Sequence, residues 1–169
     1  MRVLGIDLGS KRIGVALSNS EGTLATPYEV VARSGDRARD HRAILALAVE
    51  AEAEALVVGL PLSLDGSVGP AARAALQEVS ELGDTTGLPV ETYDERLTTV
   101  TADRSLLAQN LDAKARRKVV DKVAAAIMLQ AWLDSRSPER PHWPGPDTEP
   151  EPPPEPDLRT RPTRKHRRG

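Results

Sequence analysis

The first third of the chain has the alternating pattern of hydrophobic and polar positions that is typical of β-strands. Residues 2–8 form an apolar run, and residues 12–18 alternate large and small side chains with a period of two. The tight connection Gly9-Ser10-Lys11 joins these runs and predicts a hairpin. A third strand is expected over residues 24–32, where Pro27 marks an irregularity or an edge. We therefore expect three consecutive antiparallel strands.

The pattern then changes to the period of an α-helix. After a cap at Asp36 or Asp40, an apolar stripe predicts a helix that ends near Glu54, and the short apolar run 56–59 is typical of a central parallel strand. The remaining predicted elements are a helix over 70–82, a strand over 90–93, and helices over 98–109 and 113–133. Because strands alternate with helices in this half, we predict an α/β fold with a mixed sheet, three antiparallel strands followed by two parallel ones, flanked by helices.

Residues 138–169 have a composition unlike the rest of the chain. They hold 10 of the 14 prolines and are acidic first and basic afterwards. Such a segment buries too little apolar surface to offset the entropy of ordering it. We therefore predict one folded domain over residues 1–137 and a disordered tail over residues 138–169.

Composition excludes several classes of function. The chain has no cysteine, which rules out disulfides, thiolate metal sites and cysteine catalysis. No stretch approaches the roughly 20 apolar residues that span a bilayer, so we expect a cytoplasmic protein without membrane contact. A formal net charge of −2 argues against a generic electrostatic nucleic-acid binder, and an aromatic content of 2% argues against a base-stacking platform.

Three acidic residues lie in short motifs on separate predicted elements. Asp7 ends the first strand, Glu95 follows the strand over 90–93, and Asp121 lies inside the last helix. Carboxylates from separate elements are how proteins hold hard divalent cations such as Mg2+, whose coordination shell is completed by phosphate oxygens. The three acids therefore predict a metal site for phosphodiester chemistry, which needs no protein nucleophile.

Each acid also has a structural explanation when taken alone. Asp7 could cap the turn that follows it, and Glu95 could pair with neighbouring charges in a surface turn. Asp121 could form an ion pair with Arg117, Lys118 or Lys122 on a solvated helix face. For Asp7, the glycines nearby favour a site, since Gly5, Gly9 and Gly14 leave open space where a phosphate backbone could approach closely.

Basic and hydroxyl side chains near these acids are candidate phosphate contacts. Lys11 and Arg12 follow Asp7, and Arg96 and Thr98 follow Glu95. A basic cluster leads into Asp121, and it consists of Lys114, Arg116, Arg117, Lys118 and Lys122. Beside a carboxylate site, such charges would contact the nucleic-acid backbone, whereas elsewhere they would form a solvated face.

Four short segments, in this order and at this spacing, carry a resemblance to a known family. They are Gly5-Ile6-Asp7-Leu8-Gly9 with Arg12-Ile13-Gly14-Val15-Ala16, Val57-Val58-Gly59-Leu60-Pro61-Leu62 with Asp65-Gly66-Ser67, Asp94-Glu95-Arg96-Leu97-Thr98-Thr99, and Lys118-Val119-Val120-Asp121 with Ala124-Ala125. The chain resembles the YqgF family of the RNase H-like superfamily, also called the RuvX family of candidate Holliday-junction resolvases.

The resemblance implies an RNase H-like fold and a nuclease that uses Mg2+ or Mn2+. It also implies a role in maturing the 5′ end of pre-16S rRNA and places the catalytic and metal-binding acids at Asp7, Glu95 and Asp121. Substrate contacts are expected from Lys11, Arg12, Arg96, Thr98 and Lys118. One position departs from the family pattern: an acid is common shortly after the Thr-Thr pair, and this chain has Thr101 there and Asp103 two residues later.

Three other functions remain open at this stage. A Holliday junction resolvase for branched DNA uses the same fold and acids, and a non-catalytic module could bind RNA or ribosomal precursor particles. An actin-like or sugar-kinase ATPase also has a phosphate-binding hairpin, but it needs a second domain that 137 residues cannot supply. The chain could act as a monomer or a homodimer.

Overall fold

A five-stranded mixed sheet forms the centre of the protein. The structure is a computed structural model, and it describes residues 1–98 and 113–136. The strands are β1 (Val3–Leu8), β2 (Arg12–Ser18), β3 (Ala25–Ala32), β4 (Ala55–Leu60) and β5 (Val90–Asp94), in the spatial order β3-β2-β1-β4-β5. The first three strands are antiparallel, and β4 and β5 run parallel to β1. The expected sheet is confirmed.

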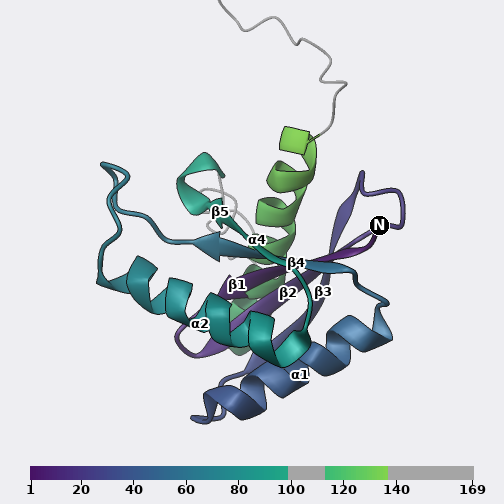
Figure 1. The fold of residues 1–169 in the computed structure, drawn as a ribbon, viewed down its shortest axis with the longest axis horizontal. Helices are drawn as coiled ribbons and strands as arrows, with labels where there is room; N and C mark the ends of the chain where they lie inside the picture. Colours follow the sequence, from purple (N-terminus) through teal and green to yellow (C-terminus); the bar gives the residue numbers. More distant parts are fainter. Residues whose placement is uncertain (99–112, 137–169) are drawn as a thin grey trace, which may run out of the picture. The chain divides into compact units, whose positions relative to one another are not determined.

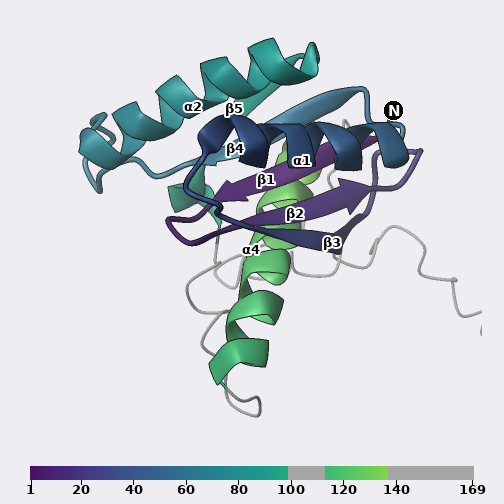
Figure 2. The ribbon, with the colours of Figure 1, turned by 90° about the horizontal axis from the view of Figure 1, so that it is seen from below.

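Helices cover both faces of this sheet. Helices α1 (Arg37–Glu50) and α2 (Pro70–Thr86) pack on one face, and α4 (Ala113–Arg136) crosses the other (Figures 1 and 2). The period of two along β1 explains this division. Leu4 and Ile6 are fully buried in the core on the α1–α2 side, whereas Val3 belongs to the core under α4. A hydrophobic core therefore packs against each face of the sheet.

The helix ends differ slightly from those predicted. Helix α1 begins after Asp36, whose side chain accepts hydrogen bonds from the main-chain nitrogens of Ala38 and Arg39. It ends at Glu50 rather than near Glu54, because Glu52 adopts a positive φ of 53°. Helix α2 continues to Thr86, past the predicted end at residue 82, and Gly87 terminates it with φ 67°.

Parts of the sequence-based prediction lie outside the described residues. They are the predicted helix over 98–109, except for Thr98, and the predicted tail over 138–169. In the part that is described, none of the helices is long and apolar enough to cross a membrane.

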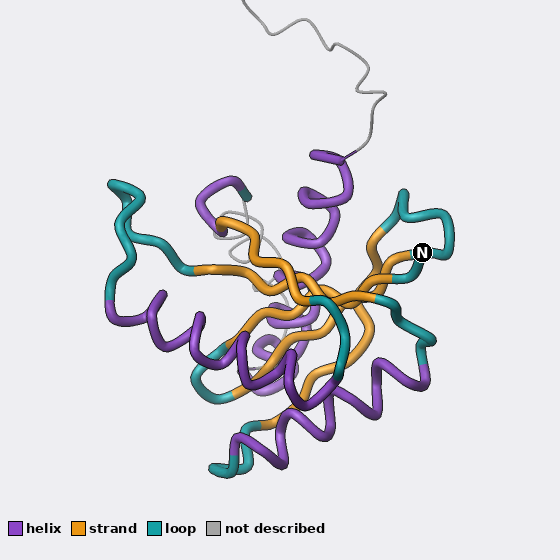
Figure 3. The backbone as a smooth tube through the Cα atoms, viewed as in Figure 1, coloured by secondary structure: helices purple, strands orange, loops and turns teal. Residues whose placement is uncertain are grey.

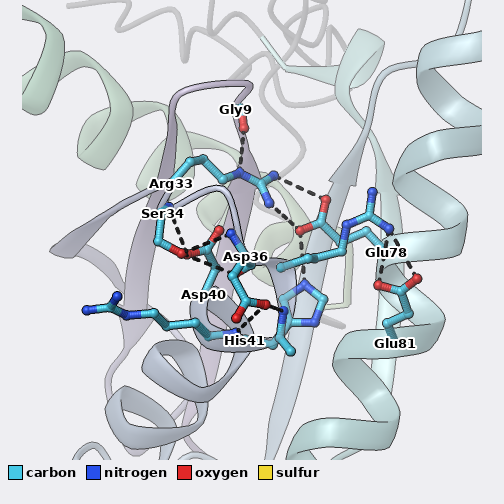
Figure 4. A network of polar contacts seen from close by, with 11 residues as sticks. Gly9, Arg33, Ser34, Asp36, Asp40, His41, Glu78 and Glu81 are labelled. Carbon is cyan, nitrogen blue, oxygen red and sulfur yellow. Dashed lines mark hydrogen bonds and ion pairs between the residues drawn. The ribbon is translucent and has the colours of Figure 1, made fainter.

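A polar network lies between α1, α2 and the end of β3 (Figure 4). Glu78 of α2 is only 6% exposed, and its carboxylate accepts hydrogen bonds from Arg33 and from Nε2 of buried His41. Asp40, 3% exposed, accepts from the main-chain nitrogen and hydroxyl of Ser34. Burial raises the pKa of Glu78 and Asp40, but these hydrogen bonds outweigh burial and hold both pKa values below the ordinary ones.

Acid is expected to destabilise the protein through this network. Because the folded-state pKa of Glu78 lies below its ordinary value of 4.5, the unfolded chain binds more protons in this range. The stabilisation is therefore complete above that ordinary value and is lost as pH falls through the lower folded-state pKa. Urea unfolding between about pH 3 and 7 measures the slope, which should become shallower in Glu78→Gln. An unchanged slope would show that other carboxyls cause the acid sensitivity.

Candidate active site

The site is built at the carboxyl end of β1, where the loops after β1 and β4 leave the sheet on the same side (Figure 3). Asp7 is the next-to-last residue of β1. By alternation along the strand, it shares the α4-facing side with Val3 and Gly5. Asp7 is half-buried.

Helix α4 carries Asp121 toward Asp7 because the helix packs directly on a glycine of the neighbouring strand. Asp7 pairs directly with Gly14 of β2. A Cβ atom on Gly14 would lie 2.1 Å from the carbonyl oxygen of Asp121, a distance that no real side chain tolerates. Only glycine lets the helix backbone approach so closely, so Gly14 sets where Asp121 stands.

The glycines around Asp7 therefore do not leave space for a phosphate backbone, and that sequence-based interpretation is wrong. The space beside Gly5 is filled by α4, with Cβ of Leu129 2.7 Å from the position of an added Cβ. The space beside Gly9 is filled by the carbonyl oxygen of Arg12, 2.3 Å away, in the turn after β1. Sequence alone shows that a glycine leaves room, but the element that uses the room depends on the fold.

Glu95 approaches Asp7 from the opposite side, again over a glycine. Gly59 of β4 follows Val58, and Val58 pairs with Ile6 just before Asp7. An added Cβ on Gly59 would lie 2.6 Å from Oε1 of Glu95. The Glu95 carboxylate therefore folds back from the short helix η1 (Glu95–Leu97) over β4. Sequence analysis missed this role of Gly59, although a glycine inside a strand signals a close approach.

The three predicted acids thus gather on the α4 face of adjacent strands. Asp121 stands over β2, Asp7 projects from β1, and Glu95 lies over β4. Strands β2, β1 and β4 are neighbours in the sheet, so the elements that carry the three acids meet on one face. Within the described part of the chain, no group of three acidic or histidine side chains stands close enough together to hold a metal ion. The donors are nevertheless carboxylate oxygens, the ligands that Mg2+ and Mn2+ prefer.

Arg12 contacts Asp121 in the structure. Its Nε donates a 2.8 Å hydrogen bond to Oδ2 of Asp121, and both side chains are about three-quarters buried, at 26% and 25% exposure. This partner differs from the three basic neighbours on the helix that the sequence offered for Asp121. The ion pair orients the carboxylate and places a positive charge among the acids.

Arg96 and Thr98 hold the segment around Glu95 in shape. Arg96 donates to both oxygens of Asp94 and also to the carbonyl oxygen of Leu64, in the loop after β4. These hydrogen bonds hold the pKa of Asp94 below its ordinary value. The hydroxyl of Thr98 donates to the carbonyl oxygen of Glu95 at 2.8 Å. Both predicted substrate contacts therefore have structural partners.

The remaining candidate phosphate contacts are exposed or make only a long contact, or their side chains lie outside the described part of the chain. Lys11 is exposed at the turn after β1. Lys122 lies 3.9 Å from a carboxylate oxygen of Glu29 on β3. Lys118 belongs to α4, but its side chain and those of the other residues of the basic cluster, Lys114, Arg116 and Arg117, lie outside the described part.

Known relatives match most of the chain. A family model described as "RuvX: Holliday junction resolvase" matches residues 1–135. A protein of Myxococcus xanthus named as a candidate pre-16S rRNA nuclease is 44% identical over 138 residues, which cover 82% of this chain and 91% of that protein. A Geobacillus thermodenitrificans protein of the same name is 41% identical and covers 80% and 99%.

Solved structures support the fold. RuvC of T. thermophilus, in a complex with a Holliday junction substrate, aligns with a TM-score of 0.51 at 21% identity, over 80% of this chain and 96% of that one. This likeness confirms the RNase H-like fold. The family model and the curated relatives together decide the membership: the chain belongs to the RuvX family of phosphodiester-hydrolysing nucleases.

Proposed function

We propose that the protein is a metal-dependent nuclease whose catalytic and metal-binding acids are Asp7, Glu95 and Asp121. The observation that carries the proposal is the pair of glycines beside Asp7. Gly14 admits the backbone of Asp121 on one side, and Gly59 admits the carboxylate of Glu95 on the other. Two independent close approaches bring acids from α4 and η1 to the same strand end. If these acids belonged to solvated surface motifs, neither close approach would be needed.

The three carboxylates are suited to bind Mg2+ or Mn2+ together with phosphate oxygens. When bound there, a metal would activate the attacking water and stabilise the leaving oxygen. Asp7, fixed on the sheet, would provide the rigid ligand. Glu95 and Asp121 reach inward from flanking elements, and Arg12 orients the Asp121 carboxylate. Lys11 and Lys118 would contact the phosphate backbone, and Arg96 and Thr98 contribute by holding the Glu95 segment.

For the substrate, we propose pre-16S rRNA at its 5′ end, in precursor particles of the cytoplasm. The names of the curated relatives support this substrate. The family description supports a second candidate, a four-way DNA junction. Both substrates present phosphodiesters in structured nucleic acid, so the acids alone do not favour either.

Parallel cleavage assays test the proposal. The purified chain is expected to cleave a precursor 16S fragment at its 5′ extension in the presence of Mg2+ or Mn2+ and to stop when EDTA is added. A four-way junction and a linear duplex of the same length serve as the competing substrates. Faster cleavage of the junction would replace the RNA substrate by branched DNA. Binding of the precursor without any metal-dependent cleavage would instead indicate a non-catalytic RNA-binding module.

A further inference from the structure

Arg33, the residue that follows β3, makes two hydrogen bonds to the turn between β1 and β2. The main-chain nitrogen of Arg33 donates to the carbonyl oxygen of Lys11 at 2.9 Å, which continues the β2–β3 ladder by one residue. Its side-chain Nε donates to the carbonyl oxygen of Gly9 at 3.0 Å. Two carbonyls of a three-residue turn are therefore fixed by one residue that follows β3. Figure 4 shows the contact between Arg33 and Gly9.

Arg33 is itself held by α2, and a residue of α1 contacts the same carboxylate. Its two terminal nitrogens bind the two carboxylate oxygens of Glu78 on α2, the second at 3.1 Å. His41 of α1, 1% exposed, lies with Nε2 3.0 Å from the same carboxylate. Since an ionised carboxylate only accepts, Nε2 of His41 carries the proton in this contact. All three guanidinium nitrogens are thus engaged in a fork geometry that lysine cannot reproduce.

The position of this turn links the network to the candidate active site. The turn begins one residue after Leu8, presents the exposed Lys11, and leads directly into Arg12, which binds Asp121. A buried ion pair adds little net stability compared with apolar residues of similar size. An arginine whose Nε reaches the turn, by contrast, fixes the directions in which Lys11 and Arg12 leave it.

We propose that Arg33 is a positioning residue, which acts from the opposite face of the sheet to fix the Gly9–Arg12 turn for nucleic-acid binding through Lys11. The inference rests on the proposed function for its binding role, and on the contacts of Arg33 alone for its effect on the turn. Glu78 and His41 orient Arg33 and so contribute indirectly.

Arg33→Lys tests the inference, with Arg37→Lys as the matched control. Arg37 also joins α1 to α2, through both oxygens of Glu81, but contacts no part of the turn. In Arg33→Lys, amide hydrogen exchange in the turn is expected to accelerate about tenfold, while the core strands stay protected. Affinity for the precursor RNA, measured without metal, should fall about fivefold to tenfold. Arg37→Lys should change neither quantity.

A double-mutant cycle with Lys11→Ala separates positioning from general stability. If Arg33 acts through Lys11, adding Arg33→Lys to Lys11→Ala should weaken binding by less than about twofold further. A full additional loss in the double variant would overturn the inference, as would unchanged exchange in the turn of Arg33→Lys. Should Arg33→Lys fold poorly, Glu78→Gln, which weakens the hold on Arg33, provides the same comparison. If exchange in the turn accelerates in Arg33→Lys but the parent chain binds no nucleic acid, Arg33 still fixes the turn and the proposed function is rejected.

Discussion

Replacing Asp7 with asparagine is expected to lower metal-dependent cleavage about 10³-fold or more, with little change in substrate binding. Asparagine keeps the shape of the side chain and its place on β1, but it removes the negative charge that a hard divalent cation requires. Asp7 also stands between the other two acids, so no neighbouring carboxylate takes over its position. Single-turnover cleavage measures the rate, and calorimetric titration with Mn2+ measures the lost metal affinity.

Asp84→Asn is the matched control for this experiment. Asp84 is exposed on α2, on the face of the sheet opposite α4, and the same change of charge there should leave cleavage and Mn2+ binding unaltered. Equal cleavage by Asp7→Asn and the parent chain would reject the three-acid site, and any activity would then come from other residues. A loss in Asp7→Asn with undiminished Mn2+ affinity would leave Asp7 catalytic but remove its role as a metal ligand.

The layers of the fold followed from periodicity because the central strands β1, β2 and β4 are buried on both faces. In β1, alternation places Leu4 and Ile6 in one core and Val3 in the other. The change from period two to a helical period likewise separated the antiparallel from the parallel strands. Helix ends were less predictable, since Gly83 lies inside α2 and the chain only turns at Gly87.

For the candidate site, the sequence pointed to the three acids but not to the side chains that contact them. Asp7, Glu95 and Asp121 stood out because each is a carboxylate at a strand end or beside an apolar helix stripe. Arg12, the partner of Asp121, did not stand out as its partner, because the two residues are 109 positions apart in the sequence. Local spacing favoured Arg117, Lys118 or Lys122 on the same helix. Only the docking of α4 over Gly14 brings Arg12 within reach.

The two glycines beside Asp7 give the second large expected effect, and they should separate stability from activity. In Gly14→Ala the new Cβ meets the backbone of Asp121, which cannot rotate away, so α4 must shift. We expect a loss of about 1–3 kcal/mol in the free energy of unfolding and a fall of about 10²-fold in cleavage. In Gly59→Ala the three atoms nearest the new Cβ all belong to the flexible side chain of Glu95. Cleavage should fall similarly, with stability nearly unchanged.

Gly83→Ala shows whether these effects come from the site. Gly83 lies inside α2, and its nearest neighbour to an added Cβ is a methyl group of Val90 at 3.5 Å, an ordinary contact. Alanine there should stabilise the helix by about 0.5–1 kcal/mol and leave cleavage unchanged. Urea unfolding and single-turnover cleavage of all three variants make the comparison. If Gly59→Ala cleaves as the parent does, Glu95 does not need its place over β4, and the metal site must be built without it.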